Sequence, residues 1–491
     1  MNPELKRNIL IEMSVQRLVA MPFILGLIFA AAWALEGVTG LITTTEVLFW
    51  VLVFLWGTRK AAGAFEAEMV NNTWDSQRLS ALTAVQIFGG KLFGSTSFVL
   101  YGALISLFVG VVGRLNLHAT SLVLPDSISP STIILDQSEI AFSAAYDLLA
   151  GLLGLVVAMF VAVVLMARTR SAKGISVTLC QLFAIAAAGV FADRLGNFGL
   201  TSFGRNFGQN ADSIVTVDWY GLAVPIVWFI GATLIVFLLW AVLGTIRQLR
   251  SVLQFRGYRW AWAVFVLFVG AYLAGFDSLY QRAPTFANQA FIFLYVVWFA
   301  AAAFTYLAVF TETKSLQGYR SYLAALKRLR FSDILQHQPF WLTSLFILII
   351  ALVLALVLGD AQTGLRSEID RDLARLLNLS SASFDFKVLL IVVSLFLLRD
   401  CLLVITLNFS PNRRRADLAA LVYLAVLYAI IPLLLNGFDL DQTMLFSFFV
   451  PQVGGGLIAS AWPVALEVIF VAVLMVIRWR KVRQPMAVDT A

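Results

Sequence analysis

The sequence predicts an all-α, polytopic membrane protein with about twelve transmembrane helices, arranged as two parallel six-helix repeats. Three observations support this fold class. Of the 491 residues, 60% are hydrophobic and only 13% are charged, whereas soluble domains are about half apolar and about a quarter charged. Apolar runs of about 20 residues, long enough to cross a bilayer as helices, recur along the chain. Every second link between these runs is rich in lysine and arginine.

The apolar runs define the expected membrane-spanning segments. The first six are residues 17–35, 40–57, 93–112, 140–165, 175–191 and 220–246. The second six are residues 260–276, 290–310, 340–358, 388–407, 418–435 and 457–479. The chain therefore divides into a first half (1–246), a cytoplasmic linker (247–259) and a second half (260–491). Because each half has an even number of crossings, both halves have the same orientation, related by an axis along the membrane normal.

The basic links set the orientation of the spans. Clusters such as Arg59-Lys60 and Arg413-Arg414-Arg415 fall in every second link, whereas the alternate links collect acidic residues. Basic links face the cytoplasm, so we expect both termini to be cytoplasmic. The first 16 residues are polar and amphipathic and lack a small-residue cleavage site, and we therefore expect no cleavable signal peptide.

Composition also excludes several classes of function. Cys180 and Cys401 lie within apolar runs, and His118 and His337 are far apart in the sequence, so we expect neither a disulfide framework nor a metal or haem site. The net charge of +7 is explained by cytoplasmic links rather than by nucleic-acid binding. No stretch satisfies G-x-x-x-x-G-K-[ST], and we expect neither an ATP site nor catalytic residues in this chain.

The link between the second and third spans, residues 58–92, is the most informative polar stretch. Its mixture of charged and apolar residues is typical of helices that lie along the membrane face. Thr73 or Asn72 is a candidate N-cap for a new helix. We expect Gly89-Gly90 to break the segment and Lys91 to lie at the level of the lipid headgroups. Taken alone, such a link is equally compatible with an interfacial element that has no partner.

The residues of this link resemble the cytoplasmic stretch of ABC-2 type permeases, the membrane subunits of many ATP-binding-cassette exporters. That stretch has an acidic residue, a Gly-Thr or similar pair, a second acid, a leucine-rich turn, Pro-Leu, Glu-Ile and Gly-Lys-Leu. The matching residues here are Glu68, Thr73, Asp75, Leu79, Leu82, Gln86-Ile87 and Gly90-Lys91-Leu92. Asn72, Ala81 and Gln86 depart from it, where Gly, Pro and Glu are common. The amino-terminal NPELKRNILIEM is similar to the family's amphipathic elbow helix.

The resemblance implies a function and a partner. In the family this link is the coupling helix, which binds a separate ATPase subunit, and export across the bacterial cytoplasmic membrane is the usual activity. Two ATPase subunits per chain would bind the ATP and Mg²⁺. The coupling residues that it implies in the first half are Glu68, Thr73, Asp75, Arg78, Leu79 and Lys91. In the second half, residues 311–339 lack the Gly-Lys-Leu ending, and the layout alone indicates Tyr322 and Arg330 as counterparts.

Charged residues also fall within the expected spans. Arg399 and Asp400 lie well inside the tenth span, Asp147 in the fourth and Glu467 in the twelfth. Such residues line transport pathways or pair with one another. One interpretation is a polar lining or a proton relay; the other is a pair between Arg399 and an acid that fixes helix packing.

Two other functions compete with the permease hypothesis. A gradient-driven secondary transporter with six-plus-six repeats would have several polar residues and discontinuous helices near mid-membrane. An intramembrane enzyme would need clustered Asp, His or Cys residues at the membrane surface, and the sequence offers none. The polar link of residues 58–92 has no role in the secondary-transporter scheme and favours the permease.

Overall fold

A computed structural model gives the fold of the chain. It describes residues 2–80, 82–123, 137–169, 176–193, 216–255, 260–279, 286–312, 314, 316–358, 386–409, 416–438, 440, 445–451 and 456–483. These residues form two compact units. Unit 1 comprises Met1–Val217 and Leu222–Gly257, and unit 2 comprises Asp218–Gly221 and Tyr258–Ala491. Each unit is described by itself.

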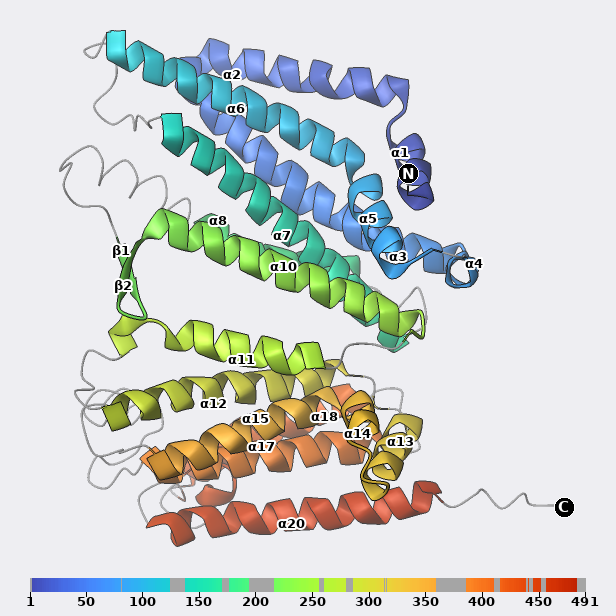
Figure 1. Cartoon of the computed structure of the whole chain (residues 1–491), viewed down its shortest axis with the longest axis vertical. Coiled ribbons are helices and arrows are strands. Elements are labelled where there is room, and N and C mark those ends of the chain that lie inside the picture. The colour runs from blue at the N-terminus through green and yellow to red at the C-terminus, as the bar shows by residue number, and fades with distance from the viewer. Residues whose placement is uncertain are drawn as a thin grey trace, which may run out of the picture. The chain divides into compact units, whose positions relative to one another are not determined.

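Unit 1 is built almost entirely from helices (Figure 1). They are α1 (Pro3–Glu12), α2 (Val15–Trp50), the π-helical η1 (Val51–Gly57), α3 (Thr58–Val70), α4 (Trp74–Leu79), α5 (Ala84–Ser95), α6 (Ser97–Val123), α7 (Gln137–Thr169), α8 (Val177–Asp193) and α10 (Ile226–Val252). Strands β1 (Thr216–Trp219) and β2 (Leu222–Pro225) pair ahead of α10, and the last two residues of β1 are assigned to unit 2. Since α10 continues to Val252, the first part of the predicted linker is helical.

The long helical run Val15–Val70 turns at Gly37. Gly37 has a φ of +67°, a conformation that glycine adopts without the steric penalty of a side chain. A small cluster around Leu25 and Phe29 packs against Leu41 and Leu48 from beyond the turn. The run therefore forms two apolar arms, and α3 continues from the end of the second arm.

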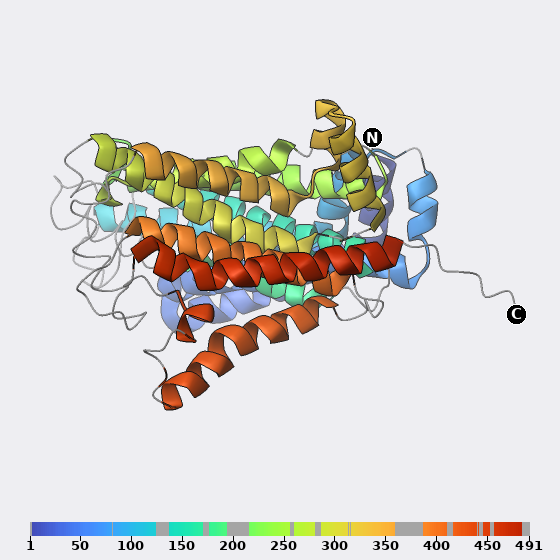
Figure 2. The same ribbon diagram turned by 90° about the horizontal axis from the view of Figure 1, so that it is seen from below.

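Unit 2 contains the second set of helices. They are α11 (Trp260–Ala274), the 3₁₀ turn η5 (Asp277–Leu279), α12 (Phe286–Thr311), α13 (Leu316–Lys327), α14 (Phe331–His337), α15 (Phe340–Leu358), α17 (Phe386–Asn408), α18 (Ala416–Ala425), the π-helical η8 (Val426–Ile430), α19 (Ile431–Gly437), the 3₁₀ turn η9 (Phe446–Phe448) and α20 (Gly456–Arg483). The principal packing pairs are α12 with α15 and α17 with α20. Figure 2 shows α18 and α19 leaning away from α20.

The structure confirms an all-α polytopic protein. Within the described residues, nine helical runs are long and apolar enough to cross a membrane, and Val15–Val70 counts as one of them. α8 and α11 contain shorter apolar stretches. Most of the predicted spans lie in a helix or a helical run, but their bounds differ: residues 220–225 of the predicted sixth span form a turn and β2, and α10 begins only at Ile226. The number of crossings and the repeat remain predictions.

Packing follows a related order in the two units. In unit 1, α2 packs on α6, and α7 packs on both α8 and α10. In the numbering of the predicted spans, α2 contains the first and most of the second, so these pairs join the first and second with the third, the fourth with the fifth and the fourth with the sixth. In unit 2, α11 packs on α15, and α17 packs on both α18 and α20, which joins the corresponding spans.

Candidate functional site

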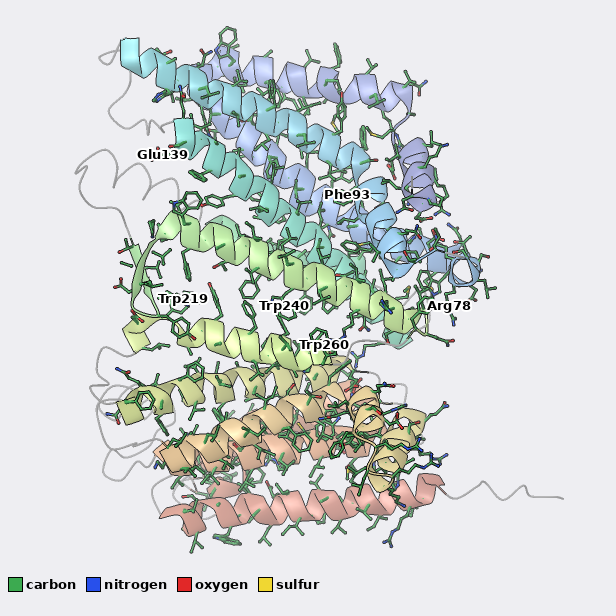
Figure 3. The ribbon with its side chains drawn as sticks, viewed as in Figure 1. Arg78, Phe93, Glu139, Trp219, Trp240 and Trp260 are labelled. Carbon is green, nitrogen blue, oxygen red and sulfur yellow. The ribbon has the colours of Figure 1, made fainter. Side chains whose placement is uncertain are left out.

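The helices of the polar link lie together at one end of unit 1. α1, α3, α4 and α5 gather there, and α1 packs along α5 (Figure 1). Figure 3 shows Arg78 of α4 at this end and Glu139, in the first turn of α7, at the opposite end. The basic residues of the link predict that the end with α4 is cytoplasmic.

Hydrogen bonds fasten α1 to α5. Asn2 caps α1 by accepting a bond from the backbone N–H of Glu4 (3.1 Å), and its Nδ2 donates to the carbonyl of Gln86 (2.6 Å). Further along α1, Nδ2 of Asn8 donates to the carbonyl of Gly90 (3.1 Å). These two amide side chains fix the position of α1 along α5.

Glycines on α5 permit this close approach. A Cβ built at Gly90 would lie 2.6 Å from Cγ of Glu4, and one at Gly94 would lie 2.6 Å from Cβ of Asn8. At Gly89 a Cβ would meet nothing within 4 Å. α5 runs unbroken through these glycines. The prediction that Gly89-Gly90 breaks the segment is therefore wrong. Gly90 instead allows α1 to pack closely against α5.

An ionic cluster, buried except for Arg7, joins α1, α3, α4 and α5. Nζ of Lys91 lies 3.1 Å from Oε1 of Glu68 and 3.6 Å from Oε1 of Glu4. Arg7 contacts the same two carboxylates, at 2.7 Å and 3.2 Å. Nε2 of Gln77 donates to both, at 2.8 Å and 3.3 Å. We call these five residues the link cluster; each of the four helices contributes to it.

Burial and charge compensation determine the electrostatics of the link cluster. Lys91 is 1% exposed, and its ammonium also lies 5.3 Å from the ring centre of Phe65. Burial lowers the pKa of Lys91, and Glu68 and Glu4 oppose that shift. Burial alone would raise the pKa of Glu68, but Lys91, Thr73 and Arg7 outweigh it and lower the pKa to about 2. Both groups are therefore held as an ion pair.

The loop before α4 is tied to the same carboxylate. The hydroxyl of Thr73 donates to Oε2 of Glu68, and the backbone N–H of Thr73 donates to the carbonyl of Glu68 (3.0 Å). Thr73 occupies the N-cap position of α4, but its side chain makes no capping bond there. Trp74 is buried edge-on against Phe65, with ring centres 6.2 Å apart. These contacts hold α4 against α3.

The other face of α4 is open. Asp75 and Arg78 form an exposed pair at 3.4 Å, and Leu79 is 89% exposed. The structure thus divides the predicted coupling residues of the first half. Asp75, Arg78 and Leu79 point outward, whereas Glu68, Thr73 and Lys91 hold the helices together.

Lys91 does not face the surroundings, because two carboxylates bind its ammonium inside the protein; its level relative to the headgroups stays a prediction. Sequence reasoning also missed Glu4, Arg7 and Gln77. Glu4 and Arg7 stand three residues apart on the predicted elbow helix, and that spacing places them on one helix face. This spacing was the one sequence pattern that could have indicated the pair.

The corresponding link of unit 2 has a different construction. Lys314 pairs with Asp417 at 2.9 Å, and Asn408 donates to the same Oδ1 at 2.9 Å. Tyr322 is partly buried on α13. Arg330 is 67% exposed and lies 4.0 Å from Asp333. The structure does not bring Tyr322 and Arg330 into an ionic cluster like that of unit 1.

The intramembrane charges of unit 2 form a compact group. Arg399 lies 2.9 Å from Asp400 and 2.6 Å from Glu467. The hydroxyls of Tyr306 and Tyr428 donate to Oδ2 of Asp400 at 2.7 Å and 2.6 Å. Both Arg399 and Asp400 are buried, so this group ties together α12, α17, η8 and α20.

Unit 1 has a smaller polar group, on α2, α6 and α7. Arg114 lies 3.3 Å from Glu46 and donates to Ser143 at 3.2 Å. Asp147 is buried one helical turn after Ser143, on the same face of α7. Asp147 belongs to unit 1, whereas Arg399 and Asp400 belong to unit 2.

The sequence matches no known protein family, no curated protein and no solved structure.

Proposed function

We propose that this chain is the membrane permease of an ATP-driven transporter of the ABC-2 type, moving an unidentified cargo across the cytoplasmic membrane, with export the expected direction. A separate ATPase subunit, in two copies, supplies the energy and holds the ATP and Mg²⁺. The link cluster is the observation that carries this proposal. It makes a rigid body of four helices at the end of unit 1 that bears the exposed α4.

The geometry of α3 supports a role in transmitting force. α3 extends 13 residues beyond η1, about 20 Å at 1.5 Å per residue. α4 therefore stands away from the apolar arms, within reach of a soluble partner. Asp75, Arg78 and Leu79 give it opposite charges and an apolar side chain for that contact.

The connections of the link cluster supply the path to the membrane. α1 is followed at Val15 by the first apolar arm, and α5 is followed at Ser97 by α6. A partner that moves α4 as a rigid body would move both of these helices, because ionic and hydrogen bonds join α1 and α5 to it. Rigid packing is required here, since a loose link would absorb the movement.

Charge reversal at α4 tests the proposal. Asp75→Lys with Arg78→Glu preserves the exposed pair but inverts its direction, and we expect it to abolish copurification of the ATPase and cargo flux. Both side chains are exposed, so thermal stability in detergent should not change. Lys6→Glu, at an exposed position of α1, is the control. Wild-type copurification and flux in the α4 variant would overturn the proposal.

The Arg399 group favours a second candidate, a gradient-driven transporter. Buried ionisable groups within apolar helices are typical of proton pathways. Here, however, Asp400 already accepts two tyrosine hydroxyls and contacts Arg399, which suits structural pairing equally well. Transport that stops when the proton gradient collapses, but continues after ATP depletion, would establish this second function instead.

A further inference from the structure

We propose that α13 and α14 of unit 2 form a binding surface for anionic lipid headgroups at the cytoplasmic face of the membrane. The surface consists of apolar side chains flanked by basic ones. The apolar members are Leu323, Leu326, Leu329, Phe331 and Leu335, and the basic members are Arg320, Lys327, Arg328 and Arg330. This inference gives Arg330, which the layout indicated as an ATPase-coupling residue of the second half, to the lipid surface instead.

The two helices lie where headgroups are expected. α12 ends at Thr311 and α15 begins at Phe340, so the pair follows one apolar helix closely and precedes the next. In both views α13 and α14 run across the direction of α12, α15 and α20, at the end of unit 2 where α20 terminates (Figures 1 and 2). Helices that lie across the spans at their ends are parallel to the membrane surface.

An apolar stripe on α13 begins within the protein and continues beyond it. Tyr319 packs edge-on against Phe409, with ring centres 5.5 Å apart, and its hydroxyl accepts a bond from Trp341 (3.0 Å). Leu323 and Leu326 follow four and seven residues later, on the same helix face. They are 39% and 44% exposed. The face that packs on the protein at Tyr319 therefore meets the surroundings at Leu326.

The basic residues of α13 and α14 indicate that the medium around this stripe is anionic. Between residues 316 and 337 there are four lysines or arginines and a single acid, Asp333. Long basic side chains beside an apolar stripe place their charges among headgroups while the leucines enter the acyl boundary. Basic residues near an anionic leaflet attract it electrostatically. α4, with its balanced Asp75–Arg78 pair, lacks this bias.

The backbone at Leu329 supports an external contact. Leu329 has a φ of +50° and is 74% exposed. This left-handed conformation at a helix end favours glycine, and a leucine there is strained. A large apolar side chain at this strained and exposed position is suited to insertion into an apolar medium.

Fluorescence quenching in lipid nanodiscs tests the proposal on the full chain. A bimane probe at Leu326→Cys is compared with one at Leu79→Cys on α4, which we expect to remain in water. The native Cys180 and Cys401 are fully buried and should not react. Nanodiscs contain phosphatidylcholine with or without phosphatidylglycerol, and quenchers are headgroup-level nitroxide lipid and aqueous iodide.

We expect the nitroxide lipid to quench the Leu326→Cys probe several-fold more than the Leu79→Cys probe, with an increase when phosphatidylglycerol is present. Arg320→Gln with Lys327→Gln should remove that increase without changing thermal stability. Leu329→Gly should weaken lipid quenching while leaving the fold at least as stable. Equal quenching at both sites, or no effect of phosphatidylglycerol, would overturn the proposal. Shielding that appears only when an ATPase subunit is added would assign the surface to a protein instead.

Discussion

Replacing Gly90 by alanine should disrupt the docking of α1 on α5. The new Cβ would lie 2.6 Å from Cγ and 2.7 Å from Cβ of Glu4, and 3.0 Å from the backbone nitrogen of Leu5. Backbone at that distance cannot rotate away, so α1 must move and the link cluster must stretch. Overpacking of this kind costs about 1–3 kcal/mol, whereas alanine within a helix gains about 0.5–1 kcal/mol over glycine. We expect a net loss of about 1–2 kcal/mol.

Gly89 provides a matched control on the same helix. Because a Cβ there meets nothing within 4 Å, Gly89→Ala should be neutral or stabilise by up to about 1 kcal/mol. The assay is thermal unfolding in detergent, combined with amide hydrogen exchange of residues 3–12. Faster exchange in α1 is expected only for Gly90→Ala. If Gly90→Ala were as stable and as protected as Gly89→Ala, the close approach of α1 and α5 would be refuted.

Three further predictions concern buried charge. Lys91→Met leaves two buried carboxylates without their shared cation and should destabilise by about 3–5 kcal/mol. Lys60 of α3 forms a partly exposed pair with Glu12 of α1 at 2.7 Å, and Lys60→Met should cost less than about 1 kcal/mol; thermal unfolding separates the two variants. Arg399→Met should destabilise unit 2 by about 3–5 kcal/mol, because it leaves Asp400 and Glu467 without their shared cation. Faster hydrogen exchange in α17 and α20 is the measurement, and wild-type protection of these helices would contradict the prediction. The pKa of Glu68 is lowered to about 2 from 4.5, so its stabilisation is present above pH 4.5 and is lost as the pH falls towards 2. Glu68→Gln should remove that part of the acid sensitivity, and an unchanged acid-unfolding profile would argue against it.

Local composition was enough to predict the helices. A residue is placed in a membrane-spanning helix by the apolar length of its own segment, because a backbone in hydrocarbon must satisfy its hydrogen bonds internally. The runs at 140–165 and 340–358 therefore fall within α7 and α15. The same reasoning located the polar link, whereas Asp75 and Arg78 were singled out by the resemblance.

Only the tertiary structure decided which charges of the link face inward. The sequence places Glu4 and Lys91 far apart, and their pairing depends on α1 packing against Gly90 at a distance that no local pattern encodes. Apolar length is a property of one segment, but an ionic pair is a property of two segments and the space between them. The sequence by itself thus determined a helical membrane protein, and the fold determined that Lys91 holds helices together.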